Sequence, residues 1–600
     1  MYYYNPWNLD YKQPFGAIKV GNSMSLSFTT DQPSVLVTCV IRRDFGKRYE
    51  FSMSKDSGGD FRITIPFDEE PGLYFYHFEI VESSDLGETR RFYGCSGIGG
   101  EGLLYTDEND VKPYQLTVFE KEDQAPNWYR EAVFYQIFPD RFYNGNENGQ
   151  INHPKPNSFI YGRKTDSPFY VKEENGDIAR WDFFGGNLRG IIKKIPYLKE
   201  LGINAIYLNP IFSGTSNHRY DTNDYLKIDS MLGRQEDFEE LIQLLHQEKM
   251  HLVLDGVFSH VGKNSLYFNI NGDYGDDEGA AKNPDSPYFD WFKFENYPFD
   301  YKSWWGIKDL PEIDKDNDSF RNFIYGEKNS VLAKWNDLGI DGWRLDVADE
   351  LPDSFIKGIR ENLDSYSDKI LIGEIWEDAS NKISYGKRRN YILGGSLQAA
   401  MNYPFRDLII NLLNGHRSSQ DVAHQLMTLQ ENYPKDIFYN NLNNLGTHDT
   451  ERILTMVGEK NLSVALAMLF VLPGIPCIYY GDEAGLSGGK DPENRKYFPW
   501  DNISPKIYNA YKSWTQKRLS ENSLKYGEFS TFFTDRLLGI LRYTDSEVFV
   551  ELINPSEDEL NIEVQEITFL QNLKFLPELK KLLTEKVISG KTNLELKMKI

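Results

Sequence analysis

The feature that most constrains the fold is a series of short apolar runs that alternate with amphipathic helical patterns between residues 125 and 520. In the helical segments apolar residues recur at intervals of three and four, as in Ile191, Ile195 and Leu198. Eight strand–helix units in series predict an α/β fold, a (β/α)₈ TIM barrel. The expected strands are 132–138, 205–210, 251–258, 342–347, 370–376, 396–403, 441–449 and 474–482.

The segments before and after this series have a different pattern of apolar and polar residues. Before it, short runs such as 61–67 and 72–80 alternate apolar and polar residues and are separated by turn-rich spacers, which predicts an N-terminal antiparallel β-sandwich. After it, runs at 537–543 and 547–553 predict a small C-terminal β-domain. The expected domains are 1–124 for the sandwich, 125–522 for the catalytic barrel and 523–600 for the C-terminal domain.

The longest connection follows the third expected strand. Residues 264–311 are rich in Asp, Gly and aromatic side chains, and we expect an inserted domain at about 261–315. Because this segment leaves the C-terminal end of a strand, it should overhang the mouth of the barrel, where active sites of this fold lie.

The charge balance bears on the partner. Acidic side chains outnumber basic ones by 90 to 66, which gives a formal net charge of -24. Such a charge argues against nucleic acid and anionic membranes as partners, and a neutral substrate fits better.

The cysteines and the apolar segments indicate the cellular compartment in which the protein is expected. The three cysteines, Cys39, Cys95 and Cys477, are widely spaced and form neither a disulfide framework nor a zinc pattern. The first residues lack the basic and apolar regions of a signal peptide. The longest apolar stretch, 464–480, contains two prolines and is expected to form a helix followed by a buried strand. We therefore expect a cytoplasmic protein.

Polar residues stand at the C-terminal ends of several expected strands, so residues far apart in sequence should meet on one rim of the barrel. The third strand ends with Asp255 and His260, the fourth with Arg344 and Asp346, the fifth with Glu374, and the seventh with His448 and Asp449.

Arg344 and Asp346 should point to the same face, because side chains alternate along a strand. A neighbouring cation favours the ionised carboxylate, which is the form that a carboxylate nucleophile requires. The alternative for this pair is a structural ion pair.

Glu374 lies within an apolar run, where burial favours the protonated carboxyl group. One ionised Asp and one protonated Glu suit retaining glycoside hydrolysis, in which the Asp attacks the anomeric carbon and the Glu protonates the leaving oxygen. A third acid, Asp449, could stabilise positive charge in the transition state.

The chain resembles the α-amylase superfamily over about residues 125–520. Within it, the chain is most similar to the group of neopullulanases, cyclomaltodextrinases and maltogenic amylases, because of residues 347–350 after Asp346, Trp376 after Glu374, and a β-domain ahead of the barrel. The segments similar to the hallmark regions are 255–260, 342–346, 373–376 and 446–449, together with 135–142 for the first strand and 310–314 near the end of the insertion.

The resemblance implies a role for each residue of the rim. Asp346 would be the nucleophile, Glu374 the general acid/base and Asp449 the transition-state stabiliser, and Arg344 would orient Asp346. In the resembled group the N-terminal domain often completes a neighbour's site, which implies a homodimer. The substrate-binding set would be Tyr220 stacked beneath the sugar ring, His260 and His448 on its hydroxyls, and His218, Asp255, Arg344 and Trp376 around them.

The chain also departs from the family pattern. Ser259 stands where many α-amylases carry a calcium-binding Asn, and Asp349 and Glu377 replace the Asn and His that are typical of the group. The preference of the subsites beyond the cleaved bond is therefore open.

A structural calcium ion is a separate expectation. Asn144, Asn146, Gly185 and Asn187 lie where the resembled group can hold calcium, and oxygen ligands suit that ion. The alternative is a cluster of Asn and Gly turns, since acidic ligands expected there are replaced by amides.

These observations predict a cytoplasmic retaining glycoside hydrolase that cleaves α-1,4-glucosidic bonds in maltodextrins, cyclodextrins or pullulan, without a required cofactor. Its partner would be an α-glucan oligosaccharide, with no nucleic acid and no membrane. The alternatives are an α-glucan transferase, an α-amylase acting on longer starch chains, and a carbohydrate-binding protein without catalysis.

Overall fold

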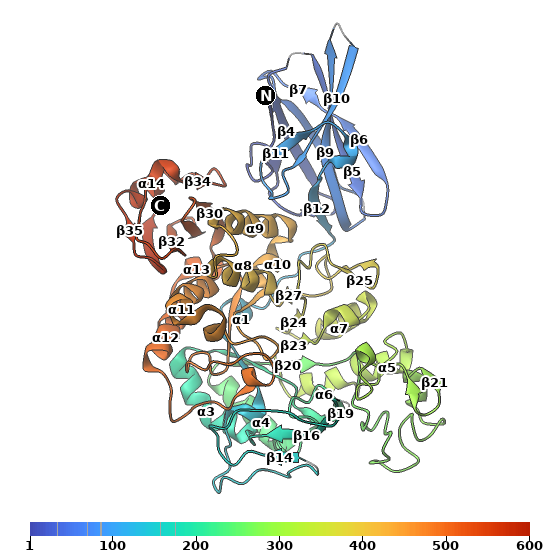
Figure 1. Ribbon diagram of the computed structural model, residues 1–600. Coiled ribbons are helices and arrows are strands. Elements are labelled where there is room, and N and C mark those ends of the chain that lie inside the picture. Colours follow the sequence, from blue (N-terminus) through green and yellow to red (C-terminus); the bar gives the residue numbers. More distant parts are fainter. Residues whose placement is uncertain (33, 69, 85–86, 157, 175) are drawn as a thin grey trace.

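A computed structural model describes residues 1–600 apart from 33, 69, 85–86, 157 and 175 (Figure 1). At its centre eight parallel strands lie in the order β27-β24-β23-β20-β17-β13-β29-β28, so successive barrel strands pair with each other except β27 and β28, which form the two ends of this order. This arrangement confirms the predicted barrel. The strands are β13 (Phe134–Ile137), β17 (Ala205–Leu208), β20 (His251–Gly256), β23 (Gly342–Leu345), β24 (Ile370–Gly373), β27 (Ala399–Ala400), β28 (Leu442–Asn444) and β29 (Ile475–Tyr479).

The barrel closes at a seam between β27 and β28. A parallel bridge joins Met401 to Leu442. Side-chain amides supply further bonds, because Asn441 Oδ1 accepts the backbone N–H of Ala400 at 2.9 Å and Asn402 Nδ2 donates to Asn443 Oδ1 at 2.8 Å. The seam therefore relies on asparagine side chains as much as on backbone pairing.

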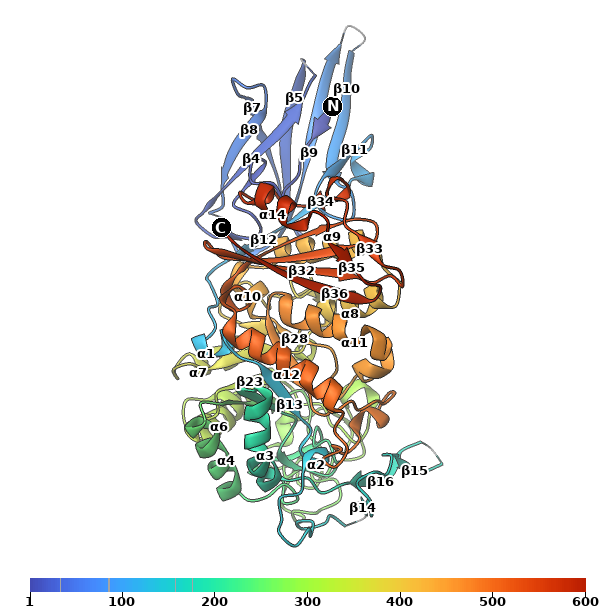
Figure 2. The same cartoon turned by 90° about the vertical axis from the view of Figure 1, so that its left-hand side faces the viewer.

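Helices cover the outside of the barrel (Figures 1 and 2). The spacing of apolar residues explains which faces they bury: in α4 the buried side chains are Phe238, Leu241, Ile242 and Leu245. The helices are α3 (Leu188–Leu201), α4 (Gln235–Gln247), α5 (Asp318–Tyr325), α6 (Val331–Asp337), α7 (Asp353–Leu363), α8 (Tyr403–Leu413), α9 (Ser419–Asn432), α10 (Lys435–Asn440), α11 (Ile453–Val471), α12 (Pro505–Ser520) and α13 (Asn522–Tyr526), with the single turns α1 (Asn127–Arg130) and α2 (Pro139–Phe142) flanking β13.

Helix α11 is, among the described residues, the one helix that is long and apolar enough to cross a membrane by length and composition, and 61% of its apolar window is buried. It packs against α8, α12 and β29, and its buried side chains belong to the main hydrophobic core. As predicted, β29 follows it as a buried strand.

Several connections at the C-terminal ends of the strands are long. The insertion after β20 carries β21 (Phe294–Asn296), β22 (Asp300–Tyr301) and the short turns η2 (Phe289–Trp291) and η3 (Trp304–Gly306). A second excursion, which the sequence patterns did not predict, follows β13. Its strands are β14 (Ser158–Ile160), β15 (Val171–Lys172) and β16 (Ile178–Phe183), and further hairpins are β18 (Phe212–Gly214) with β19 (Thr222–Ile228) and β25 (Ile383–Ser384) with β26 (Lys387–Arg388).

The N-terminal region forms two sheets around an aromatic core that includes Tyr4, Phe28 and Phe78. Figure 2 shows these sheets at the top of the molecule, above α9. The strands are β1 (Tyr2–Tyr3), β2 (Lys12–Gln13), β4 (Ser23–Thr30), β7 (Ser54–Lys55) and β8 (Phe61–Pro66) in one sheet, and β3 (Ile18–Lys19), β5 (Val35–Arg43), β6 (Arg48–Ser52), β9 (Gly72–Ser84), β10 (Gly87–Cys95), β11 (Gly102–Tyr105) and β12 (Tyr114–Phe119) in the other.

The C-terminal region forms a five-stranded sheet in the order β34-β30-β31-β32-β36, which packs near α11 and α9. Its elements are β30 (Glu528–Phe533), β31 (Leu538–Tyr543), β32 (Glu547–Asn554), β34 (Thr568–Phe569), β36 (Thr592–Lys599) and helix α14 (Leu576–Leu583), with the small pair β33 (Leu560–Asn561) and β35 (Val587–Ile588) beside them. All three cysteines are free.

Candidate active site

The predicted acids meet at the C-terminal ends of the barrel strands. Asp346 directly follows β23, Glu374 directly follows β24, and Asp449 lies in the turn after β28. All three line one cavity of about 830 Å³. The same cavity is lined by Tyr220, His218, His260, His448 and Trp376 from the predicted binding set, while Asp255 and Arg344 lie buried next to it.

Arg344 is the charged centre of the cluster. Its Nη1 donates to Asp255 Oδ1 at 2.8 Å and to Asp346 Oδ1 at 2.9 Å, and its Nη2 lies 2.8 Å from Glu374 Oε2. The barrel register explains this, because Asp255 pairs with Arg344 across β20 and β23, and β24 is the next strand on the other side. One fully buried cation is thus shared by three carboxyl groups.

Burial and the neighbouring charges act in opposite directions on the pKa of Asp346. Burial raises the pKa of Asp346 well above its ordinary value; Arg344 opposes that rise, and the charges of Glu374, Asp255 and Asp449 add to it. Arg344 thus favours the ionised carboxylate, as expected, while burial and the neighbouring acids favour the protonated form. The sequence showed the arginine but not the acids that compete for it.

Glu374 is fixed from both sides of its carboxyl group. Its Oε2 accepts the backbone N–H of Val347 at 2.7 Å, and its Oε1 accepts Nε1–H of Trp376 at 3.0 Å. Val347 has a φ of 36°, which is a rare backbone conformation for a β-branched residue. This strained turn directly after Asp346 holds the two acids next to each other.

Asp449 reaches the cavity from the turn after β28. Its Oδ2 lies 3.1 Å from His448 Nε2, its Oδ1 lies 3.6 Å from Arg495 Nη2, and its side chain is 33% exposed. Burial and the charge of Glu374 raise the pKa of Asp449 to about 7, while Arg495 lowers it.

The predicted sugar-binding residues form a continuous hydrogen-bonded network. Tyr220 donates its hydroxyl hydrogen to Asp255 Oδ2 at 2.8 Å, and its ring stacks on His448 with centroids 5.2 Å apart. The tyrosine oxygen accepts from His448 Nε2 at 2.7 Å, while Gln136 Nε2 donates to Nδ1 at 3.0 Å, which assigns the hydrogen to Nε2. Burial and Arg495 place the pKa of His448 well below its ordinary value, so the ring is neutral.

The two other histidines support the same tyrosine. His260 Nε2 bonds the carbonyl oxygen of Tyr220 at 3.1 Å, and the backbone N–H of Tyr220 donates to His218 Nδ1 at 3.1 Å. Burial lowers the pKa of His260 to about 4 and holds the pKa of His218 well below its ordinary value. Neutral rings at these positions suit a neutral ligand.

Three contributors to the site were not predicted. Arg495 contacts Asp449 and lies in the loop after β29, where no spacing pattern marks it. Tyr207 donates to Asp255 Oδ2 at 2.6 Å, and its position in the apolar strand β17 was a signal that could have been used. The positive φ of Val347 has no signal in the sequence.

The residues of the predicted calcium site also lie close together, but they form hydrogen bonds with one another and with nearby protein groups. Asn144 Oδ1 accepts N–H groups of Asn146 at 2.9 Å and Asn187 at 3.0 Å. Asn187 Oδ1 accepts the N–H of Gly190 at 2.8 Å and so caps α3, and Gly185 donates its N–H to Asp140. The amide oxygens of Asn144 and Asn187 are thus engaged, and the amides carry no charge, so this donor set does not fit calcium well and favours the alternative of a turn cluster.

Comparisons with known proteins agree with this site. The family model for the alpha amylase catalytic domain matches residues 136–521. The chain is 35% identical to an amylopullulanase of Thermoanaerobacterium saccharolyticum over 94% of its own length, but it spans only 49% of that relative, and 39% and 33% of two other amylopullulanases.

Other relatives match over most of their own length. A cyclomaltodextrinase of Geobacillus thermopakistaniensis is 32% identical over 86% of each chain. The solved structure of a maltogenic amylase from S. marinus covers 97% of this chain and 81% of its own, with a TM-score of 0.65 and 27% identity. Since the catalytic-domain model matches more than half of the residues and spans all three clustered acids, the chain belongs to the α-amylase family.

Proposed function

We propose that the protein is a retaining glycoside hydrolase that cleaves α-1,4-glucosidic bonds in maltodextrins, cyclodextrins or pullulan. The observation that carries this proposal is the placement of Asp346 and Glu374 on one guanidinium, with Asp449 lining the same cavity. Sharing one group holds the two carboxyls side by side, and retaining enzymes need a short separation of about 5–5.5 Å.

In the first step, Asp346 attacks the anomeric carbon and the bond to the leaving oxygen breaks, while Glu374 gives its proton to that oxygen. The sugar is then esterified to Asp346. In the second step, Glu374 takes a proton from water as the water oxygen attacks the anomeric carbon, and Asp346 is released. Asp449 stabilises the positive charge of both oxocarbenium-like transition states.

The substrate class is supported by charge and by similarity. A chain with a net charge of -24 and neutral histidines in the cavity favours a neutral sugar over an anionic one. Relatives at 32–33% identity carry the names cyclomaltodextrinase, neopullulanase and maltogenic alpha-amylase, and these names support the proposed substrates.

A product time course on cyclodextrin, pullulan and soluble starch tests this function. We expect maltose and related short products from all three, with cyclodextrin cleaved at least as fast as starch. Asp346→Asn should lower kcat by at least about 10³-fold, because the covalent step is lost. The exposed Asp545→Asn is the matched control and should leave kcat unchanged.

The same assay separates the alternatives. With maltotriose, a hydrolase releases free glucose and maltose, whereas a transferase accumulates longer oligomers. A rate that is highest on starch and absent on cyclodextrin would indicate an α-amylase of longer chains. Turnover that is unchanged in Asp346→Asn would contradict the proposed mechanism.

A cytoplasmic location and a homodimer belong to this proposal. A Bacillus subtilis relative that is 34% identical over 75% of this chain is named an intracellular maltogenic amylase, which supports the location. Leu36 of β5 and Phe45, in the turn after β5, are 68% and 84% exposed, so these apolar side chains are available for a contact with a second copy. Light scattering measures the mass in solution and so tests the dimer.

A further inference from the structure

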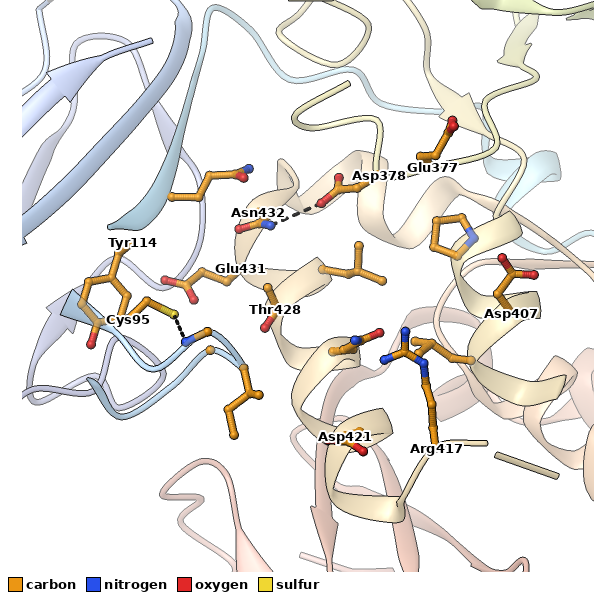
Figure 3. A pocket seen from close by; sticks show the side chains of 18 of the residues that line it. Cys95, Tyr114, Glu377, Asp378, Asp407, Arg417, Asp421, Thr428, Glu431 and Asn432 are labelled. Atoms are coloured by element: carbon orange, nitrogen blue, oxygen red, sulfur yellow. Dashed lines mark hydrogen bonds between the residues drawn. The ribbon is translucent and has the colours of Figure 1, made fainter. Parts of the chain in front are cut away.

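A second cavity, of about 590 Å³, lies between the N-terminal sheets and helices α8 and α9 (Figure 3). Its volume falls in the range of small-molecule sites. The N-terminal sheets contribute residues such as Ile98 and Tyr114, and the helix side contributes residues such as Arg417 and Gln425. Trp376 lines both this cavity and the catalytic one. The two cavities are therefore adjacent, with Trp376 between them.

Trp376 is held in place by Tyr403 and Glu374. Its ring stacks on Tyr403 with centroids 3.8 Å apart and an interplanar angle of 10°, and its Nε1 donates to Glu374. It is 41% exposed, so an apolar face remains accessible. Stacking on flat aromatic faces is a common way to bind the apolar side of a sugar ring.

Buried contacts between the two domains fix the walls of the cavity. Glu431 accepts from Lys12 Nζ at 3.1 Å and from Trp7 Nε1 at 2.9 Å. Thr117 Oγ1 donates to the carbonyl oxygen of Asn432 at 2.6 Å. These groups are nearly all inaccessible to solvent, so the cavity is a feature of the docked domains.

Polar side chains are available inside. Among the described residues, no hydrogen bond of the Arg417 guanidinium or the Gln425 amide is recorded, and Figure 3 shows the Arg417 side chain directed toward the middle of the cavity. The carboxylates in the described lining outnumber this one guanidinium, which disfavours phosphate and other anions. A neutral ligand rich in hydroxyl groups can donate to carboxylates and accept from the guanidinium.

We infer that this cavity binds a second stretch of the same α-glucan chain whose scissile bond lies in the catalytic cavity. The inference rests on the proposed function and extends it to chain length. A glucan long enough to pass Trp376 contacts both cavities, whereas a trisaccharide occupies the catalytic one alone. The enzyme should therefore turn over long linear glucans with a higher kcat/KM than maltotriose.

The test compares long amylose with maltotriose for the double variant Arg417→Ala/Gln425→Ala. Both side chains are at least partly exposed, so the fold should be kept. We expect kcat/KM on amylose to fall about fivefold to tenfold, as for the loss of one or two hydrogen bonds. The value on maltotriose should stay within twofold. Gln420→Ala, an exposed change on α9 outside the cavity, is the matched control.

A second variant approaches the cavity from the other domain. Ile98→Trp adds bulk on the wall formed by the N-terminal sheets and should cause the same selective loss on amylose. Equal losses on both substrates, or no loss on either, would overturn the inference and leave the proposed function standing. A wild-type protein that cleaves neither substrate would refute the proposed function, and this inference with it.

Discussion

At the scale of single residues, Arg344 shows what a sequence can and cannot reveal about this site. The alternation of side chains along a strand predicts that Arg344 and Asp346 share a face, and the structure has them 2.9 Å apart. The pKa shift of Asp346 could not be predicted, because it depends on burial and on Glu374 and Asp255, which reach Arg344 from neighbouring strands. Such competition for one charge exists only in three dimensions.

Arg495 should set the acid limit of activity. Burial and the charge of Glu374 raise the pKa of Asp449 to about 7, and the cation of Arg495 keeps that pKa from rising further. Asp449 is ionised above its pKa, so kcat/KM should fall as the pH drops below about 7. Replacing Arg495 with Met removes the cation and should move this acid limb to higher pH by about half a unit or more. Superimposable pH profiles that differ only in height would contradict the assignment.

At the scale of elements, patterns were reliable where burial is periodic. The buried face of α4 follows the apolar spacing, and α12 begins at Pro505, a residue type that is favoured in the first turn of a helix. The strands are shorter than predicted, because the polar residues at their C-terminal ends turn into the site, and β27 has only two residues. The excursion after β13 was missed because its strands are short and only partly buried.

Asp341 ties α4 to the start of two barrel strands and should stabilise them in a pH-dependent way. It bonds His246 at 3.1 Å, His251 at 3.0 Å and the N–H of Leu252 at 2.8 Å, and its pKa falls from 3.8 to about 2. A depressed carboxyl pKa stabilises the fold above pH 3.8, and this contribution is lost as the pH falls through 2.

The variant Asp341→Asn should therefore lose about 2 kcal/mol at pH 7. The difference from the wild type should shrink between pH 4 and pH 2. Urea unfolding at several pH values measures it, with the exposed Asp535→Asn as control. A difference that does not depend on pH would argue against this account.

The loop around Asn144 should not need a metal ion. Its amide oxygens already accept N–H groups, including the cap of α3 by Asn187. We expect EDTA to leave the melting temperature unchanged within about 1 °C, since no ligand is withdrawn from the fold. A clear drop on chelation, restored by calcium, would instead support the calcium alternative.

At the scale of the whole molecule, the three regions that differ in their pattern of apolar residues correspond to two flanking β regions and a central barrel. Their docking could not be predicted, because it depends on pairs such as Lys12 and Glu431, which lie more than 400 positions apart. The second cavity is a product of this docking, so it too lies beyond any local pattern.

The Lys12–Glu431 pair should control how firmly the N-terminal region is held. Lys12→Met leaves a buried carboxylate without its cation, which typically costs about 3–5 kcal/mol. Calorimetry should then show a separate, earlier transition. The double variant Lys12→Met/Glu431→Leu should recover part of the loss. Lys19→Met, which removes an exposed pair with Glu122, is the control and should change little.

The asparagine seam between β27 and β28 has a mechanical meaning. Elsewhere around the barrel, neighbouring strands are joined by ladders of backbone hydrogen bonds. Between β27 and β28, side-chain amides of Asn402, Asn441 and Asn443 supply part of the hydrogen bonding. Local opening of the barrel should begin at these side-chain hydrogen bonds. They lie next to Tyr403, against which the indole of Trp376 stacks. Substitution of these asparagines could therefore change how readily the barrel opens near Trp376, without a change in any of its strands.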